Sequence, residues 1–255
     1  MKLKVNKLEN KVALITGASK GIGAAIAKQF AAEGAKVVVN YASSKEGADK
    51  VVKEITDTGG TAIAIQGDVS NEAEVTRLFE ETRSAFGTLD ILVNNAGIYQ
   101  YEPIEEVSAK TFHDQFNINV LGSILAIQSS LKLFGDKGGN IINISSEAGK
   151  TPLPTGSVYS ATKAALDAIT ISLSKEFSGK NIRINSILPG VVETEGSRSA
   201  GFIGSEAETK FVANTPLGRT GQPDDIAKVA VFLASDDSAW ITGEKISVSG
   251  GIYGL

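Results

Sequence analysis

VALITGASKGIG, residues 12–23, joins a short apolar run to three glycines, and an alanine-rich segment follows it. Its first four residues are typical of a buried strand, and Ala24 to Glu33 has the spacing of a helix. Between two such elements, Gly17 permits a tight turn, Gly21 lets the backbone approach a pyrophosphate, and Gly23 lets helix and strand pack closely. The first N–H groups of a helix also attract an anion. We therefore favour dinucleotide binding over a turn whose glycines serve steric needs alone.

The same alternation of strand and helix continues along the chain. Short β-branched runs recur, and the segments between them place apolar residues at helical spacing, as in Ile22, Ile26 and Phe30. Alternating strands and helices form a parallel sheet that is covered on both faces. We therefore predict an α/β fold, a single doubly wound (Rossmann-type) domain over residues 1–255 with a mostly seven-stranded parallel sheet. The predicted strands are Val12–Ile15, Lys36–Asn40, Thr61–Ile65, Leu89–Val93, Asn140–Ile144, Ile182–Ile187 and Lys245–Val248.

Composition excludes several classes of site and partner. The chain has 255 residues, no cysteine and one histidine, so disulfides, thiol nucleophiles and Cys/His metal sites are excluded by count, and we predict no metal. A formal net charge of −4, spread without long runs of one sign, provides no basic stripe for nucleic acid. No unbroken apolar run approaches the roughly 18 residues that span a bilayer, and residues 1–10 lack the apolar core of a secretory signal. We therefore expect a cytoplasmic protein that acts on a small molecule.

The end of the second predicted strand bears on which dinucleotide is bound. An NAD site usually has an acidic residue there to accept from the ribose 2′-hydroxyl, whereas this position is the neutral Asn40. Lys20 could place an ammonium near a 2′-phosphate, with Ser43 and Ser44 as hydroxyl donors. The alternative is that Lys20 is a solvated turn residue and that the two serines only begin the next helix. We predict a preference for NADP(H), without excluding NAD(H).

Two further predicted strands end in polar or small residues. Asp68 and Val69 follow the third strand, where the carboxylate could meet an adenine amino group or cap the helix that begins near Asn71. Asn94-Asn95-Ala96-Gly97 follow the fourth. Ligands of doubly wound sheets bind at the carboxyl edge, so we expect this second group to form a wall against the cofactor. The same residue types also suit a sharp exit from a strand.

The groups that remain for acid–base chemistry stand in two segments. Ser145 and Ser146 end the fifth strand, and Tyr159 and Lys163 are four residues apart at the start of a long helix, where they share one face. An ammonium close to a phenol favours the phenolate and lowers the pKa of the tyrosine. A serine on the strand end could hold the substrate oxygen for hydride transfer from a nicotinamide. His113 has no G-x-S-x-G elbow to serve, so we expect it to be a structural residue.

In this order and spacing, the motifs resemble those of the short-chain dehydrogenase/reductase family over nearly the whole chain. The resemblance implies that Tyr159 is the general acid in reduction and that Ser146 polarises the carbonyl. It implies that Lys163 lowers the pKa of Tyr159 and binds the nicotinamide ribose, and that Asn119 holds a water in a proton relay. Ser146 is preferred to Ser145 because the family places its serine thirteen residues before the tyrosine. The matching motifs are TGASKGIG (16–23), NNAG (94–97), NVLG (119–122), NISS (143–146), YSATK (159–163) and PG (189–190).

The resemblance also implies further contacts with the cofactor. Ile22 would line its site, and Thr194 would bind the nicotinamide carboxamide. The Gly- and Ser-rich segment Pro189–Thr215 shows no clear secondary-structure pattern, and it would be a substrate lid over about 189–215. The full set of expected cofactor-binding residues is Gly17, Ser19, Lys20, Gly21, Ile22, Gly23, Asn40, Ser43, Ser44, Asp68, Val69, Asn95, Ala96, Gly97, Tyr159, Lys163, Pro189, Gly190 and Thr194.

Family members commonly form tetramers through the two long helices that carry Asn119 and Tyr159 and through the C-terminal strand, which implies a homotetramer here. Ser249 stands where relatives often have aspartate, and we attach no function to this difference.

Within the family, the sequence most resembles 3-oxoacyl-[acyl-carrier-protein] reductases and carbonyl reductases in general character. We expect NADPH-dependent, reversible reduction of a ketone or aldehyde to an alcohol. One alternative is a 3-oxoacyl-[acyl-carrier-protein] reductase that docks acyl carrier protein, since Lys137 and Lys180 lie near positions where such reductases often carry arginine. Others are a sugar or alcohol dehydrogenase using NAD(P), and a catalytically silent nucleotide-binding protein. An acidic carrier protein would be repelled by four glutamates of the predicted lid, Glu193, Glu195, Glu206 and Glu208.

Overall fold

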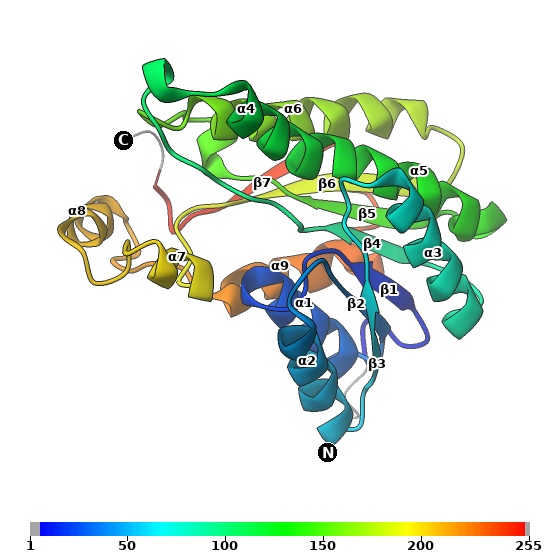
Figure 1. Cartoon of the computed structure of the whole chain (residues 1–255). Coiled ribbons are helices and arrows are strands. Elements are labelled where there is room, and N and C mark those ends of the chain that lie inside the picture. Colours follow the sequence, from blue (N-terminus) through cyan, green and yellow to red (C-terminus); the bar gives the residue numbers. More distant parts are fainter. Residues whose placement is uncertain (1–5, 253–255) are drawn as a thin grey trace.

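Residues 6–252 are described by the computed structural model, in which seven parallel strands form one sheet between two layers of helices (Figure 1). The strand order is β3-β2-β1-β4-β5-β6-β7, and it reverses direction between β1 and β4. This order confirms the predicted doubly wound, Rossmann-type sheet. The strands are β1 (Val12–Ile15), β2 (Lys36–Tyr41), β3 (Thr61–Gln66), β4 (Ile91–Asn94), β5 (Gly139–Ile144), β6 (Ile182–Pro189) and β7 (Lys245–Val248).

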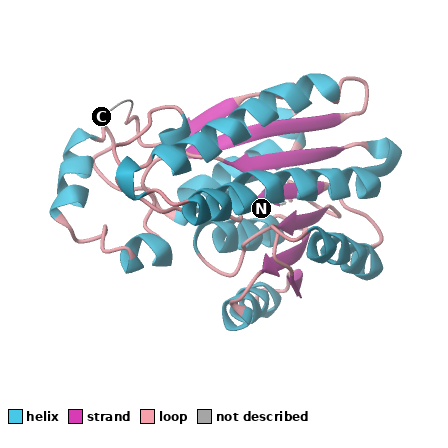
Figure 2. Cartoon of the chain, turned by 45° about the horizontal axis from the view of Figure 1, so that its top comes forward, coloured by secondary structure: helices cyan, strands magenta, loops and turns pink. Residues whose placement is uncertain are grey.

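Helices cover both faces of the sheet (Figure 2), and each face has its own apolar core. One core includes Phe30 and Ile226, from helices α1 (Gly21–Ala32) and α9 (Pro223–Ala234). The other includes Phe79 and Phe177, from α3 (Glu72–Phe86) and the end of α6 (Ser157–Glu176). Burial on both faces explains why the strands read as continuous apolar runs rather than as alternating ones. The remaining α-helices are α2 (Lys45–Asp57), α4 (Ala109–Phe116), α5 (Gly122–Phe134), α7 (Glu195–Ser199) and α8 (Glu206–Asn214).

The strand predictions differ from the structure mainly at the ends. The largest difference is at the fourth strand, which begins two residues later than predicted, at Ile91. Just before it, the Asp90 carboxylate accepts from the N–H of Val12 at 2.8 Å. Helix α1 begins at Gly21, three residues earlier than predicted, so two of the three glycines lie inside its first turn.

The segment 189–215 is the clearest correction to the predicted fold. No secondary structure is predicted for it, yet the structure contains helices α7 and α8 there. The Thr194 hydroxyl accepts from the N–H of Ser197, and the Ser205 hydroxyl accepts from the N–H of Glu208. Both are N-cap bonds, which supply the partners that the first amides of a short helix lack.

Helices α4 and α5 are joined by a π-helical turn, Asn117–Leu121, into one stretch, Ala109–Lys137. By length and composition this stretch is apolar enough to cross a membrane, and it is the only such helix among residues 6–252. In the structure it lies over the sheet beside α3 and α6 (Figure 1). Its apolar side chains, such as Ala126 and Ile127, therefore belong to one of the two cores.

Candidate active site

The carboxyl edge of the sheet brings the glycine turn together with the predicted tetrad, Asn119, Ser146, Tyr159 and Lys163. The turn leaves β1, the Asn94–Gly97 exit leaves β4, and Ser146 lies just beyond β5. Tyr159 and Lys163 lie one helical turn apart in the first half of α6. A parallel sheet places all its carboxyl ends on one edge, so residues from distant parts of the sequence meet there.

Lys163 lies at the centre of this group. Its Nζ donates to the carbonyl of Ile144 at 2.9 Å and lies 5.7 Å from the ring centroid of Tyr159. A Cβ at Gly97 would lie 3.6 Å from this Nζ and 3.3 Å from Oδ1 of Asn119. The absence of a side chain at Gly97 therefore keeps a space open beside the ammonium.

The ionisation of Tyr159 differs from the prediction. Burial raises its pKa well above the ordinary value for tyrosine; repulsion from Tyr101 adds to this, and a hydrogen bond with Ser146 opposes it only in part. Burial also lowers the pKa of Lys163 to about 8, although the nearby carboxyl of Asp167 raises it in part. The predicted lowering of the phenol pKa is therefore wrong for the chain by itself. Removing the phenolate from water destabilises it by more than the neighbouring groups stabilise it.

The structure separates the two serines. The Ser145 hydroxyl is buried and donates to the carbonyl of Lys163 at 3.2 Å, within the packing of β5 against α6. Ser146 is partly exposed, accepts from the N–H of Ala148 at 3.1 Å and bonds to the Tyr159 side chain. Of the two hydroxyls, the one at Ser146 is the one that bonds to the phenol.

Replacing each serine by alanine tests this separation. We expect Ser146→Ala to lower kcat by roughly 100-fold, the usual cost of losing one donor to a developing oxyanion. Ser145→Ala removes a buried hydrogen bond and is expected to lower the free energy of unfolding by about 1 kcal/mol, with a far smaller effect on kcat. Steady-state kinetics and denaturant unfolding of both proteins would measure this, and the reverse ranking of kcat would reassign the serine.

The Asn119 side chain is hydrogen-bonded to protein groups. Its Nδ2 donates to the carbonyl of Ile98 at 2.8 Å and to Oγ1 of Thr162 at 3.0 Å, and its Oδ1 accepts from the N–H of Ile98 at 2.8 Å. Both amide hydrogens are therefore already used, and they are not free to hold a relay water. The side chain instead fixes the backbone that follows the β4 exit.

The glycine turn is fixed by residues from β1 and β4. The Asn95 side chain donates to the carbonyls of Thr16 at 2.9 Å and Gly17 at 3.0 Å, and the Thr16 hydroxyl accepts from the N–H groups of Asn95 and Ala96. A Cβ at Gly23 would lie 2.4 Å from Nδ2 of Asn95, so only glycine fits there. Asn95, which we predicted to form part of a wall against the cofactor, thus holds the glycine turn in place by direct hydrogen bonds.

Asn40 and Asp68 contact protein groups. The buried Asn40 side chain accepts from the N–H of Gly17 at 3.2 Å and donates to the carbonyls of Ile65 and Gly67. An aspartate could not make those two donations, so the neutral residue has a structural reason here besides any effect on a 2′-phosphate. Asp68 accepts from Ser70 and does not cap α3, because Asn71 caps that helix.

The residues predicted to select NADP lie at the surface beside the turn. Lys20 is exposed and makes no salt bridge within residues 6–252. Ser44 precedes α2, but its hydroxyl makes no cap hydrogen bond. A Cβ at Gly47 would lie 2.7 Å from the carbonyl oxygen of Ser19 and 2.8 Å from Oγ of Ser44, which puts these two residues side by side. Ser43 is exposed on the same loop.

The start of α1 already holds an anion. The N–H of Gly21 donates to Oε2 of Glu195 at 3.0 Å, and the methyl of Thr194 would lie 3.4 Å from a Cβ at Gly21. Because the turn amide binds a carboxylate, it also suits the pyrophosphate of a dinucleotide. The residues at this edge therefore fit the predicted cofactor.

Four other residues predicted to bind the cofactor pack against other parts of the protein. Ile22 packs against one core, and buried Val69 packs against Gly122. Pro189 ends β6, and a Cβ at Gly190 would lie 3.0 Å from Ser249. His113, predicted to be a structural residue, is exposed on α4 and its ring contacts Phe112.

Two residues with a clear place in the site are missing from the sequence prediction. Tyr99 and Tyr101 follow the β4 exit, and their ring centroids lie 6.2 and 5.7 Å from that of Tyr159. Their positions in the sequence could have indicated this, because residues that follow NNAG lie at the carboxyl edge of the sheet, where the ligand binds.

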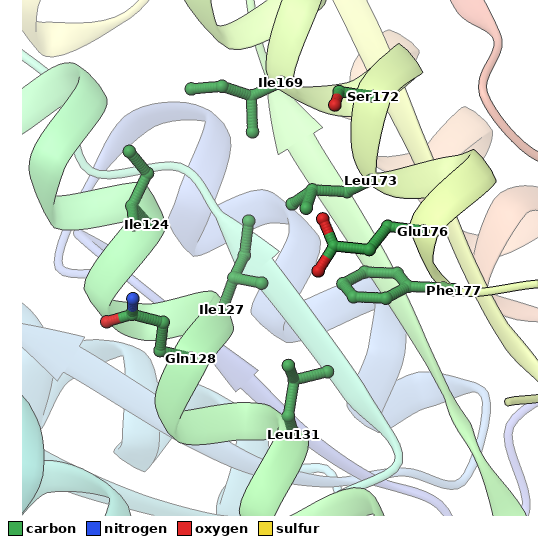
Figure 3. Close-up of a pocket in the computed structure, with 9 residues that line it drawn as sticks. All are labelled: Ile124, Ile127, Gln128, Leu131, Ile169, Ser172, Leu173, Glu176 and Phe177. Atoms are coloured by element: carbon green, nitrogen blue, oxygen red, sulfur yellow. The ribbon is translucent and has the colours of Figure 1, made fainter.

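A separate apolar groove of about 340 Å³ lies between α5 and α6 (Figure 3). It lies further along both helices than Asn119 and Tyr159, so it is not part of the candidate active site. Its lining residues are Ile124, Ile127, Gln128, Leu131, Ile169, Ser172, Leu173, Glu176 and Phe177.

Comparisons with known proteins agree with this geometry. The family model described as "Enoyl-(Acyl carrier protein) reductase" matches residues 17–253. An uncharacterized oxidoreductase of Methylorubrum extorquens is 56% identical over 97% of this chain and 100% of its own. A versicolorin reductase of Emericella nidulans is 38% identical over 97% of each chain. A 3-oxoacyl-[acyl-carrier-protein] reductase of Staphylococcus aureus is 39% identical over 95% of this chain and 98% of its own.

A solved structure shows the same arrangement. A short-chain dehydrogenase/reductase from Serratia marcescens superposes with a TM-score of 0.90 at 34% identity, covering 96% of this chain and 98% of that one. Both the sequence relatives and this structure align over almost the full length, with the tetrad and the glycine turn at the same sheet edge of this chain. The chain therefore belongs to the short-chain dehydrogenase/reductase family, and it is an oxidoreductase that acts on CH–OH or C=O groups.

Proposed function

We propose that the protein reduces a ketone or aldehyde to an alcohol with NADPH, and that the reaction is reversible. The observation that carries this proposal is the cluster of Lys163, Tyr159 and Ser146 at the carboxyl edge of the sheet. Nζ of Lys163 borders the space beside Gly97 and lies 5.7 Å from the ring centroid of Tyr159, and the phenol bonds to Ser146. A bound nicotinamide would supply the hydride to the carbonyl carbon.

The roles of the chain's own residues follow from their contacts. Ser146 and Tyr159 bind the carbonyl oxygen, and the high pKa of the buried phenol keeps it protonated, so it can donate the proton that the new alkoxide needs. Lys163 is held by the Ile144 carbonyl, where its charge stabilises the phenolate left after that donation. The same ammonium would hold the nicotinamide ribose, and the Gly21 amide would hold the pyrophosphate.

The second candidate is a 3-oxoacyl-[acyl-carrier-protein] reductase, favoured by the Staphylococcus aureus relative. Lys137 and Lys180 come just before β5 and β6, at the edge of the sheet opposite to Ser146. A six-residue strand is about 20 Å long, so in a single chain these lysines do not flank the active-site mouth. This distance applies within one subunit, so in a homotetramer it does not separate the two candidates.

A substrate panel tests the proposed function. Small ketones, aldehydes, a sugar and an acyl-carrier thioester would each be offered to the full-length protein with NADPH, and consumption of the cofactor would be measured. We expect turnover with small ketones. Turnover with the thioester alone would favour the second candidate, and no turnover with any of them would contradict both.

Preference for NADPH is expected to depend on Lys20. Lys20→Ala removes the exposed ammonium beside the turn and should lower kcat/KM for NADPH about tenfold while changing that for NADH little, since only NADPH carries the 2′-phosphate. Lys28→Ala is the matched control, because Lys28 lies on α1, the helix that Lys20 directly precedes, and pairs with Glu54. Equal losses with both cofactors, or equal kcat/KM for both in the native protein, would contradict the predicted selectivity.

A homotetramer and a cytoplasmic location remain part of the proposal. The groove between α5 and α6 supports self-association, since family resemblance assigns these helices to the subunit interface. Trp240, which is 100% exposed and precedes β7, supports the second expected interface. Size-exclusion chromatography with light scattering measures the oligomeric state.

A further inference from the structure

The segment that follows the β4 exit has a fixed backbone. Asn119 holds both the N–H and the carbonyl of Ile98, each at 2.8 Å. Four residues later, the N–H of Glu102 donates to the carbonyl of Thr155 at 2.8 Å, in the loop before α6. The side chains between these two attachments therefore project from a backbone that is held at both ends.

Two of those side chains are tyrosines that surround the reactive phenol. Tyr99 and Tyr101 have ring centroids 5.9 Å apart, and they meet the Tyr159 ring at interplanar angles of 72° and 61°. Both are partly open to solvent, with 45% and 46% of their surfaces exposed. Edge-to-face contacts at these separations are favourable, so the three rings form a stable aromatic wall.

Glycines on the opposing segments make room for the two rings. A Cβ at Gly196, in α7, would lie 3.1 Å from the hydroxyl oxygen of Tyr99. A Cβ at Gly156, directly before α6, would lie 3.1 Å from Cε1 of Tyr101. Both glycines thus let the rings pack closely between the predicted lid and the helix that carries Tyr159.

The surface of this wall is neutral. Burial raises the pKa of both Tyr99 and Tyr101, so neither phenol ionises near neutral pH. Neither hydroxyl bonds to another residue among those the structure describes. The carboxylates on the adjoining segments already have partners, since Glu102 accepts from the Gln100 side chain and Glu193 pairs with Arg198. A neutral aromatic surface favours a flat, uncharged ligand.

We propose that Tyr99 and Tyr101 determine substrate specificity, and that the substrates are neutral aryl ketones or aldehydes whose ring packs against theirs. A carbonyl oxygen held by Tyr159 and Ser146 places its substituent beside the two rings. An aryl substituent can make stacked and edge-to-face contacts with the two rings, whereas an aliphatic substituent gains only from the burial of its apolar surface. This inference rests on the proposed function, because it concerns the group attached to the carbonyl that Tyr159 protonates.

The test uses two ketones that differ only in aromaticity, phenyl methyl ketone and cyclohexyl methyl ketone, with NADPH. The ratio of their kcat/KM values is compared between native and variant proteins, so the difference in intrinsic reactivity cancels. We expect Tyr99→Leu and Tyr101→Leu each to lower the aryl-to-cyclohexyl ratio about fivefold, mainly through KM for the aryl ketone. Tyr99→Phe and Tyr101→Phe should keep the native ratio, since they keep the ring.

Phe112→Leu provides the matched control, since Phe112 is an exposed aromatic residue on α4 that we place outside the site. An unchanged ratio in both leucine variants would overturn the inference while leaving carbonyl reduction intact. Absence of NADPH consumption with every carbonyl compound would instead contradict the proposed function.

If the leucine variants do not fold, binding can be measured without them. In Tyr159→Phe protein, saturation-transfer NMR of phenyl methyl ketone should show stronger transfer to ring protons than to methyl protons. Equal or weaker transfer to the ring would overturn the inference.

Discussion

Tyr159→Phe is expected to abolish hydride transfer almost completely, with kcat falling by about 10³. A positioned general acid usually accounts for 10²- to 10⁴-fold, and no other phenol is hydrogen-bonded to Ser146 in the described part of the chain. The ring itself stays, so its contacts with Tyr99 and Tyr101 are retained. Rapid-mixing measurement of NADPH consumption with a saturating ketone would give the rate of the chemical step.

Cofactor binding provides the control for this variant. The hydroxyl of Tyr159 is not part of the glycine turn, so the Kd for NADPH, from fluorescence titration, should change less than twofold. A variant that still turns over within tenfold of the native rate would remove Tyr159 as the acid. A variant that loses NADPH binding as well would show a general disturbance of the site.

Lys163→Met is expected to lower kcat/KM about 100-fold. Methionine keeps most of the volume of the side chain but removes the charge that would stabilise a phenolate at Tyr159, an effect of the size seen when one electrostatic donor is lost. It also removes the bond from Nζ to the Ile144 carbonyl. Steady-state kinetics at several pH values would measure the loss, and a rate equal to the native one would contradict the role given to the ammonium.

The same variant has a second expected effect, on stability as a function of pH. Burial lowers the pKa of Lys163 to about 8 from the ordinary lysine value of 10.5. Between these values the folded protein has released the proton while the unfolded chain still holds it, so the free energy of unfolding rises with pH over this window. At about 1.4 kcal/mol for each unit of pKa, the full rise is about 3 kcal/mol.

Lys163→Met should remove this rise. Because the pKa of Tyr159 is raised, its effect has the opposite sign above pH 10, so the comparison belongs between pH 8 and 10. Urea unfolding of both proteins across this range would measure the slope. Parallel curves for the two proteins would show that Lys163 is not the group that titrates.

Most of the fold could be predicted because its signals are local. The central strands β1 and β4 are runs of mainly apolar residues that are buried throughout, and the glycine turn follows β1 directly, so no distant contact was needed to place them. The helices of segment 189–215 also had a local signal that went unused. Ser205 stands three residues before Glu208, the spacing of a capping box.

The parts of the site that could not be predicted depend on contacts between distant residues. The direction of the pKa shift at Tyr159 comes from burial and from Tyr101, which is 58 residues away in the sequence. The amide of Asn119 is occupied by Ile98 and Thr162, and neither contact follows from spacing. The order of the motifs thus identified these residues. Their pKa shifts and hydrogen-bond partners depend on the packing and could not be predicted.

The contact between Glu195 and the Gly21 amide has a consequence for how a dinucleotide would enter. One N–H cannot donate fully to both a glutamate and a phosphate, so the two anions compete for it. Arrival of the cofactor would then expel the carboxylate and free the start of α7. The same displacement of Glu195 by a phosphate would therefore set both the affinity for the nucleotide and the mobility of the segment that contains α7.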